Sequence, residues 1–333
     1  AMAELIDARQ RAARKLPGWP VAQLLLDRRG VEQCSHLACA RWRARELEAG
    51  PLLDVCGGLG IDSACLADTC DVTHAEIDAQ RQTLARHNHA ILERQITYHA
   101  GDGLVAATAR SWATIFLDPS RRDETGRRSL DLAHLQPAPL RIHRELLDQC
   151  QELVYKLAPG CDAQALAEQL PGSTEIAYLS VEGEAKEAQV RCRRTDDPAQ
   201  PPRRRAIMLT SRGETRCALN GMPAAAAGED RPCPGRWLAI CDPALICAGL
   251  VNTLAAQEDA AVLRAASGLL LLSSAQPHPA WRLHEIIAVG ACRPKAISGL
   301  LREAGVPGAR IIDRGAGIAA AQWQRGIPSH DGY

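Results

Sequence analysis

A glycine-rich turn between an apolar run and a helical pattern is the feature that most constrains the fold. Residues Leu52–Cys56 read as a buried strand, and the turn DVCGGLGID places Gly57, Gly58 and Gly60 directly before a helix. Glycine lets the backbone approach a ligand closely, and the helix N-terminus offers free N–H groups. This strand–turn–helix unit predicts an α/β protein that binds a ligand at the turn. A plain tight turn is the alternative.

Strand and helix patterns alternate after this turn. The expected strands cover 72–77, 96–99, 114–117 and 153–157, and the expected helices run to about residue 68 and over 79–93, 140–150 and 162–170. Two further runs with strand character, 175–181 and 187–193, are joined by Glu182-Gly183-Glu184, which predicts an antiparallel hairpin. Alternating units closed by a hairpin predict a doubly wound, Rossmann-like α/β sheet with one reversed strand.

The rest of the chain predicts two further regions. A length of 333 residues suggests two domains with an additional segment. Residues 1–48 read as helices, of which 31–49 is the clearest, and the proline-rich run 194–202 reads as a linker. The expected organisation is an N-terminal helical segment (1–48), a sheet domain (49–195) and a small α+β module (203–330). In this module we expect a hairpin at 205–219, helices at 243–255 and 294–304, and strands at 269–272, 282–289 and 310–313.

Composition limits the classes of partner. The 39 basic residues equal the 39 acidic residues, so nucleic-acid binding would need local patches rather than bulk charge. Aromatic residues make up only 3% of the chain, which disfavours repeated stacking platforms for RNA. The 13 cysteines contain no Cys-x-x-Cys pair, so we expect reduced thiols and no metal site. No signal peptide or membrane span is apparent, and we expect a cytoplasmic monomer.

Acidic residues follow the second and third expected strands. Glu76 ends the second strand, beside Ile77, and Asp102-Gly103 follows the third. A carboxylate about 20 residues after the first glycine turn can accept hydrogen bonds from ribose hydroxyls. Asp102 can accept from the amino group of adenine, although it can also simply form a turn. Asp78 is expected to cap the helix that follows.

A further polar motif follows the fourth strand. Asp118, Pro119 and Ser120 stand at its carboxyl end, the region where ligands bind in doubly wound sheets. Four arginines follow closely: Arg121, Arg122, Arg127 and Arg128. These residues predict a site for a reacting group and a polyanion, and a solvated basic loop is the alternative.

In this order, the motifs resemble those of class I S-adenosylmethionine-dependent methyltransferases. DVCGGLGID is similar to their first motif, HAEID to the second and GDGL to the third, and LDPSRR stands where amino-methyltransferases carry Asp/Asn/Ser-Pro-Pro-aromatic. Together with KLPGW, VEQCS and EGEAKEA, they resemble the bacterial methyltransferases that carry a C-terminal THUMP-like domain. The core is also similar to trimethylguanosine synthase. The resemblance implies a seven-stranded sheet, S-adenosylmethionine with S-adenosylhomocysteine as product, and an RNA substrate (tRNA or rRNA).

The resemblance also implies roles for individual residues. Cofactor contacts would come from Asp54, Cys56, Gly57, Gly58, Gly60, Asp62, Glu76, Ile77, Asp102, Gly103 and Asp118. Asp118 and Pro119 would serve catalysis on an exocyclic amine of a base, and Ser120 and the four arginines would bind substrate. Because Ser120-Arg121 replaces the usual Pro-aromatic pair, the methylated atom stays open.

Several alternatives stay open at this stage. The chain could methylate a small molecule or a protein, or bind the cofactor as a ribosome-assembly factor with little catalysis; a nicotinamide dehydrogenase fits less well. A second arginine cluster could bind RNA or belong to a solvated linker: Arg191, Arg193, Arg194, Arg203, Arg204 and Arg205. Lys156, at the end of the fifth strand, could reach the pocket, but we expect it at the surface. Gln33 and Ser35 could close over the cofactor, but we expect them in capping or packing. We expect His87 and His89 at the surface or in helix packing.

Overall fold

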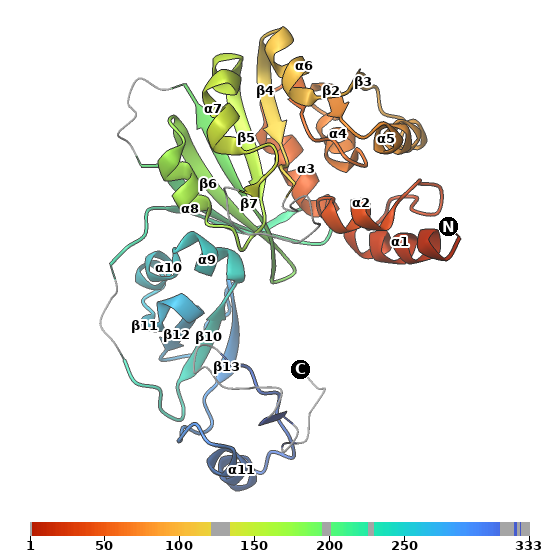
Figure 1. Ribbon diagram of the computed structural model, residues 1–333. Helices are drawn as coiled ribbons and strands as arrows, with labels where there is room; N and C mark the ends of the chain where they lie inside the picture. The colour runs from red at the N-terminus through yellow and green to blue at the C-terminus, as the bar shows by residue number, and fades with distance from the viewer. Residues whose placement is uncertain are drawn as a thin grey trace. The chain divides into compact units, whose positions relative to one another are not determined.

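The computed structural model describes residues 2–120, 134–194, 201–225, 230–313, 323–324 and 327. The chain forms two compact units, Ala1–Met222 and Pro223–Tyr333 (Figure 1). In the described part of the chain, no helix is both long and apolar enough to cross a membrane. The 13 cysteines, all of which lie within the described residues, form no disulfide bond.

The first unit is built on a nine-stranded sheet with the order β3-β2-β1-β4-β5-β7-β6-β8-β9. Its strands are β1 (Pro51–Asp54), β2 (Asp71–Glu76), β3 (Thr97–Ala100), β4 (Trp112–Leu117), β5 (Cys150–Leu157), β6 (Ser173–Val181), β7 (Glu184–Arg193), β8 (Arg203–Leu209) and β9 (Thr215–Gly221). Strands β1 to β5 pair in parallel, and β7 runs antiparallel to both β5 and β6. The predicted doubly wound sheet with a closing hairpin is therefore confirmed. Strand order reverses between β1 and β4, which opens a crevice at their carboxyl ends.

The sheet is wider than the seven strands expected. The hairpin predicted at 205–219 is present as β8 and β9, and β8 pairs in parallel with β6 from Glu175↔Arg203 to Val181↔Leu209. The hairpin therefore extends the main sheet, whereas the sequence placed it in the C-terminal module. Proline and charge in 194–202 indicated a linker, but they could not show that the chain returns to the same sheet.

Helices flank the sheet and form the N-terminal segment (Figure 1). They are α1 (Met2–Lys15), α2 (Arg28–Gln33), α3 (Leu37–Glu46), α4 (Ile61–Leu66), α5 (Ala79–Ile91), α6 (Gly103–Ala109), α7 (Pro139–Asp148) and α8 (Ala163–Gln169). The single helix expected over 31–49 is wrong, because α2 and α3 are separate. Lys15 Nζ donates to the carbonyl oxygens of Val31 (2.9 Å), Glu32 (2.9 Å) and Cys34 (3.0 Å), which satisfies the end of α2.

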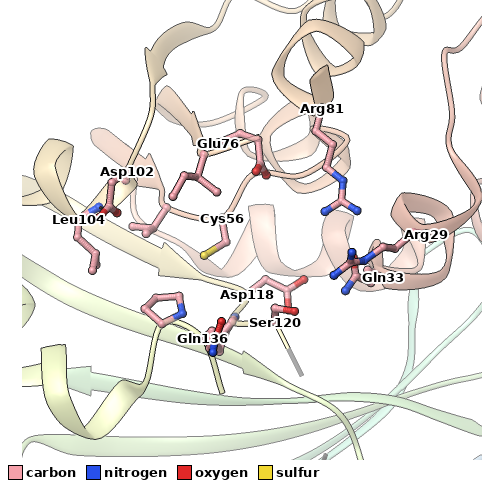
Figure 2. Close-up of a pocket in the computed structure, with 15 residues that line it drawn as sticks. Arg29, Gln33, Cys56, Glu76, Arg81, Asp102, Leu104, Asp118, Ser120 and Gln136 are labelled. Carbon is pink, nitrogen blue, oxygen red and sulfur yellow. Dashed lines mark hydrogen bonds between the residues drawn. The ribbon is translucent and has the colours of Figure 1, made fainter. Parts of the chain in front are cut away.

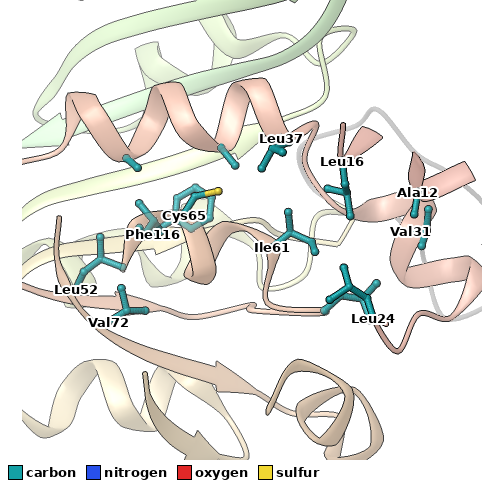
Figure 3. Close-up of a cluster of buried hydrophobic side chains, with 14 of the residues drawn as sticks. Ala12, Leu16, Leu24, Val31, Leu37, Leu52, Ile61, Cys65, Val72 and Phe116 are labelled. Carbon is teal, nitrogen blue, oxygen red and sulfur yellow. The ribbon is translucent and has the colours of Figure 1, made fainter. Parts of the chain in front are cut away.

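An apolar cluster joins the N-terminal helices to the sheet (Figure 3). Leu16 and Leu37 of the helical segment pack in it with Ile61 of α4 and with Leu52 and Phe116 of the sheet. All five side chains are almost fully buried. Because the helices share this core, we expect them to fold together with the sheet rather than as a separate domain.

The second unit contains a four-stranded antiparallel sheet with the order β11-β12-β10-β13. Its elements are β10 (Trp237–Cys241), α9 (Pro243–Ala248), α10 (Val251–Gln257), β11 (Ala261–Arg264), β12 (Leu269–Leu272), β13 (Trp281–Glu285) and α11 (Pro294–Glu303). The helix expected over 243–255 is divided at Gly249, which has a φ of 68°. Residues 310–313, expected as a strand, pair with no strand in the described part of this unit. The small α+β character of this region is as expected.

Candidate functional site

A cavity of about 540 Å³ opens in the first unit at the carboxyl ends of β1, β2, β3 and β4 (Figure 2). This size lies within the usual range for small-molecule sites. Fifteen residues line it: Arg29, Gln33, Val55, Cys56, Glu76, Ile77, Arg81, Asp102, Gly103, Leu104, Asp118, Pro119, Ser120, Gln136 and Pro137. Four separate strand ends therefore bring side chains to one cavity.

Of the 13 expected site residues that the structure describes, eight line this cavity. Those that line the cavity are Cys56, Glu76, Ile77, Asp102, Gly103, Asp118, Pro119 and Ser120. Those that lie outside its lining are Asp54, Gly57, Gly58, Gly60 and Asp62. Arg121, Arg122, Arg127 and Arg128 lie outside the described residues.

Glu76 is held in place by the backbone around it. Its Oε2 accepts the N–H of Gly58 at 2.8 Å, and its Oε1 accepts the N–H of Asp78 at 2.9 Å. The side chain of Asp78 in turn accepts the N–H groups of Gln80 and Arg81, so its predicted role as the cap of α5 is confirmed. Each carboxylate oxygen of Glu76 keeps a further lone pair for a ligand donor.

The neighbouring lining combines apolar and acidic side chains. Ile77 lies at the edge of the cavity and is 75% exposed, the highest value among the exposed large hydrophobic side chains of the described residues. Asp102 Oδ1 accepts the N–H of Leu104 at 2.9 Å and caps α6. A Cβ on Gly103 would lie 2.5 Å from the carbonyl oxygen of Val55, so glycine is required where α6 approaches β1. This part of the cavity offers hydrogen-bond acceptors beside apolar surface.

The glycine turn rests on two buried histidines. A Cβ on Gly57 would lie 2.1 Å from the His74 ring, and one on Gly60 would lie 2.2 Å from Nε2 of His89. Burial lowers the pKa of His74 to about 3 and that of His89 to about 4, so both rings are neutral at pH 7. His89 bonds the Gly60 carbonyl at 2.9 Å and the Tyr98 hydroxyl at 2.8 Å. His89, expected at the surface or in helix packing, is thus buried and also contacts the glycine turn.

Asp54 lies beneath the turn. It is 1% exposed, and its Oδ2 accepts the hydroxyl of Ser63 at 2.6 Å. The same hydroxyl lies 2.9 Å from His74 Nδ1. Burial raises the pKa of Asp54 to about 7, although the Ser63 hydrogen bond opposes this shift. Through Ser63, Asp54 is therefore linked to His74, which packs against the glycine turn.

Lys156 is not at the surface, contrary to the expectation from sequence. It is 7% exposed at the end of β5, and its Nζ donates to Oδ2 of Asp118. Burial alone would lower the pKa of Lys156, but the charges of Asp118, Asp62 and Glu187 raise it above the usual value. An ammonium group thus anchors the carboxylate that faces the cavity. The place of Lys156 at a strand end left a position in the pocket open, but nothing in the local sequence indicated the pairing with Asp118.

A buried charge cluster connects this anchor to the N-terminal helices. Arg43 of α3 is 1% exposed and donates to both Asp62 of α4 and Glu187 of β7. Its guanidinium carbon lies 4.5 Å from the ring centroid of Phe116. The Ser35 hydroxyl donates to Asp62 Oδ2 at 2.8 Å. Asp62 therefore fixes the helical segment to the sheet, and Ser35 packs as expected.

Three of the six arginines in the second cluster are paired with acidic neighbours. Arg191 and Arg193 both bond Glu152, at 2.7 Å and 2.8 Å. Arg205 bonds Glu46 at 2.6 Å and Glu175 at 3.2 Å. These three arginines connect the strands to each other and to the end of α3. They therefore match neither of the two expectations, an open RNA surface or a solvated linker.

Sequence reasoning missed two cationic residues of the cavity. Arg29 comes from α2 and Arg81 from the first turn of α5. Gln33, for which the sequence left open a place over the cofactor beside the preferred capping or packing, lines the cavity beside them. These residues belong to segments about 50 positions apart, so only the packing of α2 against the sheet unit brings them together. The described residues contain no group of three or more His, Cys, Asp or Glu side chains that could hold a metal ion.

Comparison with solved structures identifies the fold. A candidate methyltransferase from Porphyromonas gingivalis W83 superposes with a TM-score of 0.82 and 23% identity, covering 98% of this chain and 83% of that one. The chain has the fold of that protein. A methyltransferase from Pyrococcus furiosus matches with a TM-score of 0.41 and 16% identity over 57% of this chain and 96% of that one.

A third solved structure matches about half of the chain. It is the tRNA (uracil-54, C5)-methyltransferase of Pyrococcus abyssi in complex with S-adenosyl-L-homocysteine, with a TM-score of 0.35, 18% identity, and coverage of 50% of this chain and 39% of that one. No family model matches the sequence, and no curated protein matches it either.

Proposed function

We propose that this chain is an S-adenosylmethionine-dependent methyltransferase. The observation that carries the proposal is the cavity itself, where the carboxylates of Glu76, Asp102 and Asp118 meet at the ends of successive parallel strands. The fold shared with a candidate methyltransferase from Porphyromonas gingivalis supports it.

The donor set of the cavity fits this cofactor. Glu76 would accept hydrogen bonds from the two ribose hydroxyls, and Asp102 from the adenine amino group. Ile77, exposed at this edge of the cavity, would contact the flat face of the adenine. When bound, S-adenosylmethionine supplies an electrophilic methyl group on a sulfonium.

Asp118 is the residue we propose to act on the substrate. Lys156 holds its carboxylate at the cavity, so the nucleophile would be oriented by an acceptor that is already in place. For an exocyclic amine, Asp118 would accept one N–H and the Pro119 carbonyl another, which directs the nitrogen lone pair toward the methyl group. Asp118 would also take the released proton, directly or through water.

We further propose RNA, namely tRNA or rRNA, as the substrate, and the cytoplasm as the compartment. Ser120 at the edge of the cavity is followed within eight residues by Arg121, Arg122, Arg127 and Arg128, which suit phosphate groups and can stack on bases. A base would have to be unpaired or flipped to reach Asp118. The second unit is proposed as the THUMP-like module of the bacterial group that the sequence resembles.

Transfer of radiolabelled methyl groups into total RNA from a strain lacking the gene tests this function. Label that nuclease removes, and protease does not, is the expected result. The variant Asp118→Asn keeps an oxygen acceptor for Lys156 but loses the charge, so transfer should fall by about 100-fold or more while S-adenosylhomocysteine still binds. Label in protein or in a small-molecule extract would contradict the RNA substrate, and full activity of Asp118→Asn would contradict its role.

A further inference from the structure

The cavity has a cationic end that the transfer reaction described above does not use. Arg29 and Arg81 line it from α2 and α5, with Gln33 beside them. Figure 2 shows these three side chains gathered on the side of the cavity opposite to Asp102 and Leu104. The cavity is therefore polar at both ends, with acceptors at one and donors at the other.

The charge at this end is only partly compensated. Arg81 Nε lies 3.8 Å from Asp27 Oδ2, and the other oxygen of Asp27 already accepts the N–H of Gly30 at 2.6 Å. Within the described residues, Arg29 forms neither an ion pair nor a side-chain hydrogen bond. The acidic residues of the lining are engaged elsewhere: Asp118 with Lys156, and Glu76 with two backbone N–H groups. Two guanidinium groups thus face one distant carboxylate.

We propose that Arg29 and Arg81 bind the α-carboxylate of the methionine part of S-adenosylmethionine, an inference that rests on the proposed function. Guanidinium groups match carboxylates in geometry and charge. The Gln33 side-chain oxygen can accept from the neighbouring α-ammonium group. One ligand with a nucleoside at one end and an amino acid at the other satisfies both ends of the cavity, which has room for a single molecule of this size.

This assignment gives the N-terminal helices a part in cofactor binding. Helix α2 supplies Arg29 and Gln33, and a Cβ on Gly30 between them would lie 2.6 Å from the side chain of Leu59 in the glycine turn. The cationic end is therefore complete only when α2 is packed against the turn. The core shared by α1, α2 and the sheet keeps it there.

Paired titrations of the full-length chain test the carboxylate assignment. Calorimetry would compare S-adenosylhomocysteine with 5′-methylthioadenosine, which keeps the nucleoside and the thioether but lacks the amino acid. Arg29→Gln and Arg81→Gln should each lower the affinity for S-adenosylhomocysteine by about tenfold. The affinity of each variant for 5′-methylthioadenosine should stay within about twofold of that of the unchanged chain. The matched control is Arg28→Gln, which removes the same charge one residue away, where it pairs with Glu32 at 3.2 Å outside the cavity.

Each other outcome would overturn the assignment. Equal weakening of both ligands would mean that the arginines shape the cavity rather than bind the carboxylate. Unchanged affinity for S-adenosylhomocysteine, with weaker binding of inorganic phosphate, would assign the cationic end to a substrate phosphate. If the unchanged chain binds neither nucleoside, the proposed function itself fails, and the inference with it. Thermal unfolding of each variant shows whether it is folded.

Discussion

Replacement of Gly60 by alanine should destabilise the first unit by about 3 kcal/mol. Gly60 has a φ of 79°, where an alanine costs about 1 kcal/mol of strain. The new Cβ would lie 2.2 Å from His89 Nε2, so the ring must move away from Gly60 O and the Tyr98 hydroxyl. Each of these two hydrogen bonds contributes about 1 kcal/mol.

Gly58 supplies the matched control for this reasoning. Its φ is 56°, but a Cβ there would meet nothing closer than the Cys56 carbonyl oxygen at 4.0 Å. Gly58→Ala should therefore cost only the strain of about 1 kcal/mol. Urea unfolding of the full chain, followed by circular dichroism and fluorescence with a transition for each unit, measures both values.

A double-mutant cycle isolates the contribution of His89. Once His89→Ala has removed the ring, Gly60→Ala should add only its strain, which gives a coupling of about 2 kcal/mol. Gly58→Ala and His89→Ala should be additive within about 0.5 kcal/mol. Equal costs for the two glycine variants, or additivity of Gly60→Ala with His89→Ala, would refute the view that the turn glycines make room for the histidines.

Two further predictions concern charged groups around the site. Lys156→Met should lower kcat for methyl transfer by about 10- to 100-fold with little change in cofactor affinity, because Asp118 loses its anchor. Lys156→Arg should recover part of the rate. An unchanged kcat would contradict this positioning role. The pKa of Asp54, about 7 when folded, lies above its unfolded value, so the folded chain binds the extra proton and loses stability as pH rises from about 4 to about 7. Urea unfolding measures the free energy of unfolding of Asp54→Asn and of the unchanged chain at each pH. The difference between them should shift by about 3 kcal/mol in favour of the variant between about pH 5 and pH 8. A difference that does not change with pH would show that Asp54 does not carry this titration.

Local patterns were enough to predict the strand ends that form the cavity. The glycine turn, Glu76, Asp102 and Asp118 each follow an apolar strand, and in a parallel sheet such ends lie at one edge. The apolar run at Trp237–Cys241 gave no clear prediction of β10, because short apolar runs suit a strand and a buried helix equally.

Long-range partners could not be predicted in this way. Arg43 lies 19 residues from Asp62 and 144 from Glu187, and Lys156 lies 38 from Asp118. Nothing in the local sequence distinguishes these cations from surface residues, since it is the packing of α3 and β5 that buries them. The same holds for Arg29, whose place in the cavity depends on how α2 docks.

A crystal structure of the full chain with S-adenosylhomocysteine tests the central claim most directly. The account predicts the ribose hydroxyls at Glu76, the adenine between Ile77 and Asp102, and the sulfur facing Asp118. A ligand bound outside this cavity, or no binding at saturating concentration, would contradict the assignment of the chain as an S-adenosylmethionine-dependent methyltransferase.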